Sequence, residues 1–135
     1  MKKVVVFFLI VMTSMSCSND DGNNFHYEYI PVDSVVLPSE FKKDSIYELP
    51  FKYVRPTTCH FFDGFYYDRN SNIRTIAIVN GVVEQDNCTT APINPMTEIL
   101  RFIPTTEASY IFKLWKGEDS NGNDIYDEIE VPVVP

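Results

Sequence analysis

The chain has 135 residues, with 19 acidic and 11 basic side chains, and its formal net charge at pH 7 is −8. So acidic a surface repels nucleic acid and anionic lipid head groups, which argues against nucleic-acid binding. Hydrophobic residues make up 44% of the chain and aromatic residues 14%, enough to build the core of one folded domain.

The start of the chain has the organisation of a secretory signal. Lys2 and Lys3 are basic, an uninterrupted apolar run covers residues 4–12, and small and polar residues lead to Cys17. The apolar run is about half of the roughly 20 residues that a membrane-spanning helix needs. A cleaved signal peptide is therefore favoured over a permanent transmembrane helix.

The junction between Ser16 and Cys17 resembles the cleavage site of bacterial lipoprotein signal peptides, although Ser14 stands where that pattern usually has leucine. The resemblance implies a signal peptide over residues 1–16 and a lipid on Cys17. Two or more acyl chains on one cysteine give stable membrane anchoring. Ordinary secretion with a free Cys17 thiol is the alternative.

Residues 17–26 are predicted to be the lipidated cysteine and a flexible tether, because residues 18–24 offer no apolar side chain to bury. The acidic pair Asp20–Asp21 resembles the surface-export signal of Bacteroidota lipoproteins. That resemblance implies a lipid-anchored protein of the bacterial outer membrane, exposed at the cell surface. A domain facing the periplasm remains the alternative, because any soluble tether has a similar composition.

Residues 27–135 are predicted to form one all-β domain, since short apolar segments alternate with turns and no helical stripe is sustained. The clearest strand covers residues 46–55, where every second residue is apolar, and Pro50 within it indicates an edge strand or a bulge. Further strands are expected over residues 32–37, 59–67, 73–83, 97–102, 110–116 and 125–133.

About seven such strands predict an antiparallel immunoglobulin-like β-sandwich. The run that ends at Tyr110 resembles a tyrosine corner, in which the hydroxyl group hydrogen-bonds back to the preceding backbone. Phe112 stands where immunoglobulins carry a cysteine, so the resemblance concerns architecture only.

Several stretches resemble small flavobacterial surface lipoproteins of the Bacteroidota, and together they cover nearly the whole mature chain. They are residues 59–67 (CHFFDGFYY), 74–79 (RTIAIV), Cys88 and 110–117 (YIFKLWKG). The resemblance implies an exported compartment and a fold, and it implies no activity.

Cys59 and Cys88 form an even pair if Cys17 carries lipid, and cysteines of an oxidising compartment are expected to form a disulfide. The bridge would close a loop of about 30 residues and contribute roughly 3 kcal/mol. A catalytic thiol beside His60 is the rival interpretation. Adjacent residues in a strand point to opposite faces, so His60 is badly placed to deprotonate Cys59.

No catalytic constellation is recognisable elsewhere. The two histidines, His26 and His60, lack metal-ligand spacing, and the sequence has neither a glycine-rich phosphate loop nor a nucleophile elbow. We therefore expect no enzyme activity and no cofactor.

The acidic turn near the C-terminus is a weak calcium candidate, because it places oxygen ligands at part of the EF-hand spacing. The candidate ligands are Asp119, Asn121, Asn123 and Asp127. Asp124 occupies the position where that loop needs glycine, and the following residues have the pattern of a strand. A plain hairpin with an Asn121–Gly122 turn and acidic flanks is favoured.

Aromatic residues offer the other candidate site. Strand alternation places Phe112 and Leu114 on one face and Trp115 on the other, wetter face. Trp115 with Tyr66 and Tyr67 is a possible stacking platform for sugar rings. The plainer interpretation, which we favour, is that Trp115 packs beneath residues 86–96.

The predicted function is that of a membrane-anchored, exported lipoprotein acting as a non-catalytic binding or adhesion module of unknown ligand. The expected partners are the membrane, through the N-terminal lipid, and a carbohydrate or an envelope protein. The alternative is an accessory subunit of an envelope protein complex.

Overall fold

The computed structural model describes residues 24–135, which contain nine β-strands and no helix. The strands are β1 (Phe25–Ile30), β2 (Ser34–Val35), β3 (Phe41–Lys42), β4 (Tyr47–Tyr53), β5 (His60–Asn70), β6 (Ile73–Val83), β7 (Met96–Phe102), β8 (Ser109–Glu118) and β9 (Asp124–Val134). The predicted signal peptide, Cys17 and most of the predicted tether lie outside the described residues. Within those residues, no helix is long and apolar enough to span a membrane.

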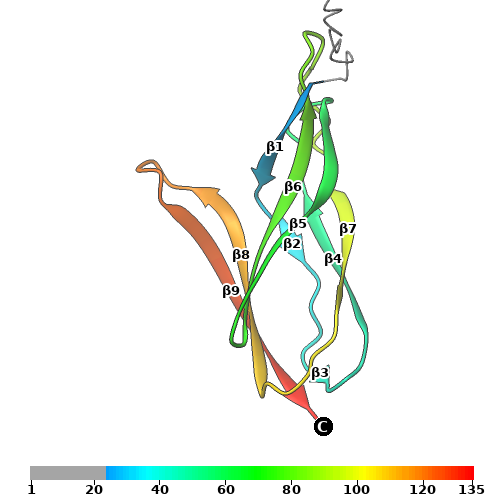
Figure 1. The fold of residues 1–135 in the computed structure, drawn as a ribbon, viewed down its shortest axis with the longest axis vertical. Coiled ribbons are helices and arrows are strands. Elements are labelled where there is room, and N and C mark those ends of the chain that lie inside the picture. Colours follow the sequence, from blue (N-terminus) through cyan, green and yellow to red (C-terminus); the bar gives the residue numbers. More distant parts are fainter. Residues whose placement is uncertain (1–23) are drawn as a thin grey trace, which may run out of the picture.

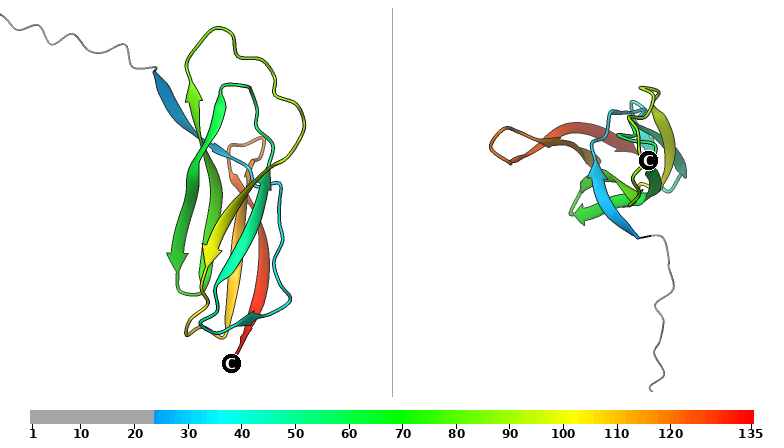
Figure 2. Two further views of the ribbon diagram at one scale, coloured as in Figure 1. Left: turned by 90° about the vertical axis from the view of Figure 1, so that its right-hand side faces the viewer. Right: turned by 90° about the horizontal axis from the view of Figure 1, so that it is seen from above.

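The strands form two sheets (Figures 1 and 2). The larger sheet has the order β1-β6-β8-β9-β3, with β5 also paired to β6, and the smaller one has the order β2-β4-β7. The all-β prediction is confirmed. β1 begins at Phe25, two residues before the predicted start of the domain.

Two details of the predicted fold are wrong. There are nine strands and not about seven, because β1 and β3 were not predicted. β3 has only two residues and shows no alternation to recognise, whereas β1 was missed although its residues alternate. The larger sheet is mixed and not antiparallel, since β6 pairs with β8, and β3 with β9, in parallel. Between β6 and β8 the chain crosses to the smaller sheet as β7, so β8 returns alongside β6 in the same direction. The immunoglobulin-like arrangement stays a prediction.

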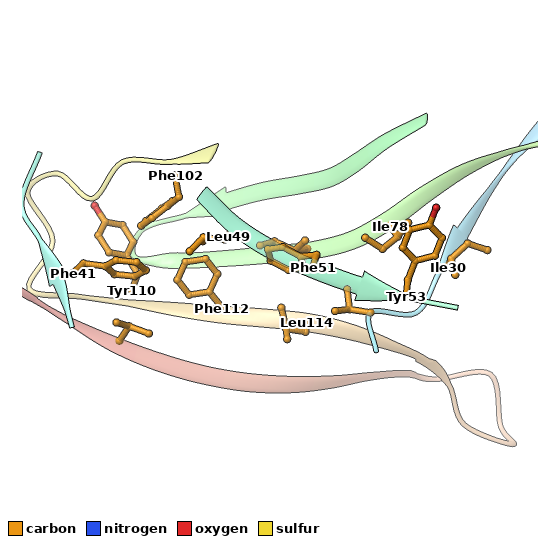
Figure 3. Packing of buried hydrophobic residues seen from close by; sticks show 13 residues of the cluster. Ile30, Phe41, Leu49, Phe51, Tyr53, Ile78, Phe102, Tyr110, Phe112 and Leu114 are labelled. Carbon is orange, nitrogen blue, oxygen red and sulfur yellow. The ribbon is translucent and has the colours of Figure 1, made fainter. Parts of the chain in front are cut away.

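The hydrophobic core lies between the two sheets (Figure 3). In β4 the alternation noted in the sequence buries Leu49, Phe51 and Tyr53, which face buried residues of β8 such as Phe112 and Leu114. Each fully buried large apolar side chain contributes about 1.5–3 kcal/mol relative to an exposed one. This packing supports the other face of the larger sheet, which carries the site described below.

Pro50 lies in the central strand of the smaller sheet, so its predicted place on an edge strand or at a bulge is wrong. Its carbonyl accepts a hydrogen bond from Val36 N at 3.2 Å, just past the end of β2. In an antiparallel sheet the N–H and C=O groups of one residue point to the same neighbour. An N–H group at Pro50 would therefore point toward the same neighbour, at a position where β2 has already ended.

The tyrosine corner predicted at Tyr110 is confirmed. Thr105 N donates a hydrogen bond to the Tyr110 hydroxyl at 2.9 Å, and the Thr105 hydroxyl lies 3.1 Å from it. The Tyr110 ring is fully buried, and the Arg74 guanidinium lies over it at 4.8 Å from the ring centroid. These contacts secure the start of β8.

The predicted disulfide between Cys59 and Cys88 is also confirmed, with the two Cα atoms 5.5 Å apart. It ties the start of β5 to the long connection between β6 and β7. Thr57 and Thr90 form a β-bridge beside it. Because both sulfur atoms are in the bridge, Cys59 does not offer the free thiol that the rival catalytic interpretation requires.

The hairpin β8–β9 diverges from the rest of the larger sheet, because β1 and β8 share one edge of β6. β1 pairs with β6 as far as Ile78, and β8 pairs with it only as far as Ile76. Beyond that point the hairpin projects away from β6 and β1 (Figures 1 and 2). The chain that leaves β1 is bound to the hairpin at the divergence, where Val32 N donates to Trp115 O at 2.9 Å.

Lys116 reinforces this junction. Its ammonium group donates to the carbonyl oxygens of Val32 and Asp33, at 2.7 and 2.8 Å. A β-bulge between Trp115 and Gly117 interrupts the pairing with β9 at the same place. Gly117 adopts φ +106°, a conformation that L-residues with a side chain rarely adopt. The divergence is thus built into the backbone.

Candidate functional site: an aromatic cleft beside the diverging hairpin

A cleft of about 340 Å³ opens where the hairpin leaves the sheet. Four aromatic residues from four strands line it: Tyr29 of β1, Tyr66 of β5, Trp115 of β8 and Tyr126 of β9. Thr75 and Ala77 of β6 also line it. Their neighbours Ile76 and Ile78 are buried in the core, so alternation turns Thr75 and Ala77 to the outer face. These small side chains leave depth between the larger rings.

The rings stand at steep angles to one another. The centroids of Tyr29 and Trp115 lie 6.2 Å apart with an interplanar angle of 67°. Those of Tyr29 and Tyr66 lie 5.6 Å apart with an angle of 83°. Edge-to-face pairs of this kind are favourable for aromatic side chains. The rings therefore form the walls of a hollow and not a flat platform.

Two carboxylates complete the cleft. The Asp124 carboxylate accepts hydrogen bonds from Trp115 Nε1 at 2.9 Å and from the Tyr126 hydroxyl at 3.5 Å. Glu118, which pairs with Asp124 across the hairpin, also lines the cleft. Burial and the adjacent negative charge of Asp124 raise the pKa of the Tyr126 hydroxyl. Tyr126 therefore stays a neutral hydrogen-bond donor at neutral pH.

A second hollow of about 510 Å³ adjoins the cleft and shares Tyr29 and Tyr66 with it. Tyr27 also lines this hollow, and the outer face of the sheet carries the exposed rings of Phe25, Tyr27 and Phe61. We call these three residues the aromatic strip. The Phe61 ring lies over Gly81, where an added Cβ would come within 2.1 Å of the ring.

The structure brings together Trp115 and Tyr66 from the predicted platform, but not Tyr67. Tyr67 pairs with Ile76 and does not line the cleft, because adjacent residues of a strand face opposite ways. Burial raises the pKa of the Tyr67 hydroxyl, against the opposing effect of the nearby Arg74. The predicted packing of Trp115 beneath residues 86–96 is wrong as well: Trp115 packs against Tyr29 and hydrogen-bonds Asp124.

Sequence reasoning missed Tyr29 and Tyr126. Tyr29 belongs to an alternating run in residues 25–30, which was a signal for a strand. Tyr126 lies opposite Trp115 because of the bulge. Regular pairing continued from Gly117–Ile125 would instead place Asp127 opposite Trp115. The local signal for this bulge was Gly117, because an isolated glycine within a strand pattern suggests a bulge.

The calcium candidate residues do not converge. The Asp119 carboxylate accepts backbone hydrogen bonds from Asn121 at 2.8 Å and Asn123 at 2.9 Å, so it stabilises the turn. These bonds, with that of Asn123 the stronger, lower the pKa of Asp119. Asp127 lies apart on β9, 3.8 Å from the Lys116 ammonium. In residues 24–135 no group of three or more His, Cys, Asp or Glu side chains is placed to hold a metal ion.

A second polar cluster, which we call the histidine clasp, joins β1 to its neighbours. The Glu28 carboxylate lies 2.8 Å from Nε2 of both His26 and His60, and Glu84 lies 3.1 Å from Nδ1 of His26. The hydrogen bond to Glu28, helped by Glu84, raises the pKa of His26. The same bond and that to His60 lower the pKa of Glu28. The clasp therefore fixes the strand that carries Tyr29.

No protein-family model, no curated protein and no solved structure matches the chain. The functional conclusion rests on the chemistry of the cleft.

Proposed function

We propose that the domain is a non-catalytic binding module and that the aromatic cleft is its ligand site. The observation that carries this proposal is the convergence of Tyr29, Tyr66, Trp115 and Tyr126, from four strands, around one hollow. Its volume of about 340 Å³ lies at the lower end of the range for small-molecule sites, about 300–1,000 Å³. Aromatic walls with a few placed polar groups are the usual lining of such sites.

We also propose that the module is a lipoprotein, anchored through Cys17 to the outer membrane and displayed at the cell surface. The signal-like start, the Ser16–Cys17 junction and the acidic tether support this proposal. The disulfide suits an oxidising compartment. Labelling with radioactive palmitate should mark the wild-type protein and not Cys17→Ala, and protease added to intact cells should digest the domain. Label retained by Cys17→Ala would contradict the anchor.

The tyrosine corner at Tyr110 supports the further proposal of an immunoglobulin-like relationship between the sheets. The parallel pairing of β6 with β8 differs from the antiparallel sandwich that the sequence predicted, so the proposed arrangement has to include one parallel pair in the larger sheet between these strands. An experimental structure with a bound ligand would test both the sheet arrangement and the site.

Trp115 is the only tryptophan of the chain and lies in the cleft, so its fluorescence reports on binding directly. We expect a saturable change in emission when the purified protein is titrated with soluble envelope or host glycans and small organic ligands. Tyr66→Ala should abolish or strongly weaken that change, because it removes one wall of the cleft. Tyr67→Ala is the matched control, since Tyr67 does not line the cleft. A flat response to every ligand would refute the binding site.

A second function, as an accessory subunit of an envelope protein complex, is favoured by the aromatic strip. Phe25, Tyr27 and Phe61 are about half exposed and lie outside the cleft, on the same face of the sheet. Contiguous exposed aromatic surface is typical of protein interfaces. Replacing all three by serine should abolish co-purification of a specific envelope protein while leaving the fluorescence titration unchanged. An unchanged set of co-purifying proteins would count against this second function.

A further inference from the structure

We infer that the cleft recognises a cationic ligand group, namely a primary or quaternary alkylammonium. This inference rests on the proposed binding function and names the chemistry of the group that enters the cleft. It is carried by the orientation of the aromatic rings and by the charge of the groups between them.

The ring orientation favours a compact cation over a flat sugar ring. A sugar ring stacks best on one open aromatic face or on rings that share a plane. Here Tyr29 meets Trp115 at 67° and Tyr66 at 83°, so Tyr29 shares a plane with neither ring, and four aromatic side chains line one cleft. A cation within about 6 Å of a ring centroid is attracted by the negative face of the ring, and several such rings form a cage.

The charge of the cleft points the same way. Two acidic side chains, Asp124 and Glu118, line it, and no Lys or Arg does. Among residues 24–135, neither carboxylate forms an ion pair with a basic side chain. Trp115 Nε1 holds the Asp124 carboxylate in place at 2.9 Å. A cationic ligand would therefore pair with carboxylates that have no basic partner among these residues.

The protein already displays this chemistry on one of the same rings. The Lys113 ammonium lies 4.4 Å from the centroid of the Tyr126 ring. The ammonium group of the other nearby lysine, Lys116, donates hydrogen bonds to the carbonyl oxygens of Val32 and Asp33. Both lysines of the hairpin therefore contact partners within the protein, and neither lines the cleft.

The test is a fluorescence titration of the purified protein with choline and with 3,3-dimethylbutan-1-ol, which has the same shape but no charge. We expect saturable binding of choline and at least tenfold weaker binding of the alcohol. Raised salt should weaken choline binding, because the attraction of partly exposed charges is screened. Lysine amide and glucosamine oligomers, compared with N-acetylglucosamine oligomers, then distinguish a protein side chain from an amino sugar as the natural source of the ammonium group.

Asp124→Asn removes the charge and keeps an oxygen for the Trp115 hydrogen bond. It should weaken choline binding about 5- to 30-fold, while Asp127→Asn, on the same hairpin outside the cleft, should leave binding unchanged. Thermal unfolding of both variants checks that the fold persists. Equal losses in the two variants would overturn the inference.

The remaining outcomes separate this inference from the proposed function. Equal binding of choline and its neutral analogue, or preference for N-acetylated oligomers, would overturn the cationic ligand and leave a binding module. No response to any ligand, charged or neutral, would overturn both. Choline binding that is lost in Tyr66→Ala and retained in Tyr67→Ala would support both.

Discussion

Replacing Tyr110 by phenylalanine tests whether the tyrosine corner stabilises the fold. The substitution removes only the hydroxyl group, which accepts from Thr105 N at 2.9 Å and lies 3.1 Å from the Thr105 hydroxyl. The buried ring stays in place, and with it the contact with the Arg74 guanidinium at 4.8 Å. Any loss of stability therefore belongs to the hydrogen bonds.

Each intramolecular hydrogen bond contributes about 0.5–1.5 kcal/mol, so two contribute about 1–3 kcal/mol, and we expect the free energy of unfolding to fall by about 1–2 kcal/mol, in the lower part of that range. The hydrogen bond from Thr105 N is only partly buried, which keeps the cost of its loss below the penalty for a fully buried donor without a partner. For a domain of this size the melting temperature should fall by about 4–8 °C.

Urea unfolding measures this change, and the midpoint should shift while the slope of the transition stays constant. Tyr47→Phe is the matched control, because the Tyr47 hydroxyl also accepts a backbone N–H five residues earlier, from Lys42 at 2.7 Å, but in an exposed contact. It should cost less than about 1 kcal/mol. If Tyr110→Phe costs no more than Tyr47→Phe, the corner has no special role.

Two further predictions concern the disulfide and the histidine clasp. Replacing Cys59 and Cys88 together by alanine should lower the free energy of unfolding by roughly 3–4 kcal/mol in urea unfolding, because the open chain regains the freedom of a loop of about 30 residues; an unchanged midpoint would contradict this. The raised pKa of His26 stabilises the fold fully below about pH 6.5, and this stabilisation is lost as the pH rises through the pKa of His26 in the folded protein. The lowered pKa of Glu28 stabilises the fold above about pH 4.5, and this stabilisation is lost as the pH falls through the pKa of Glu28 in the folded protein. The difference in melting temperature between wild type and His26→Ala should therefore be largest between pH 4.5 and 6.5, and a difference that is constant from pH 5 to 9 would argue against the clasp.

Local patterns were sufficient to predict all the described strands except β1 and β3, and several of their faces. In β8 the alternation correctly buried Phe112 and Leu114 and left Trp115 on the opposite face. The disulfide was predictable from the number of cysteines once Cys17 was set aside. Tyr67 was an avoidable error, since the same alternation excludes two adjacent tyrosines from one face.

The cleft itself was not predictable in this way. It exists because β1 and β8 divide one edge of β6 between Ile76 and Ile78, and because a bulge turns Tyr126 toward Trp115. The first feature depends on pairing between segments far apart in the chain, and the second on the register of the β8–β9 hairpin. A single sequence specifies the faces of each strand much better than the register between distant strands.

The position of β1 links the cleft to whatever pulls on the chain before it. Tension on the chain before Asn24 would enter the domain at Phe25, where β1 pairs with Val83, and would reach Tyr29 only four residues later. A pull away from the sheet would break the pairs one after another, with the histidine clasp resisting first. A ligand held against Tyr29 would brace the same strand from the other end, so an occupied cleft would bear more load than an empty one.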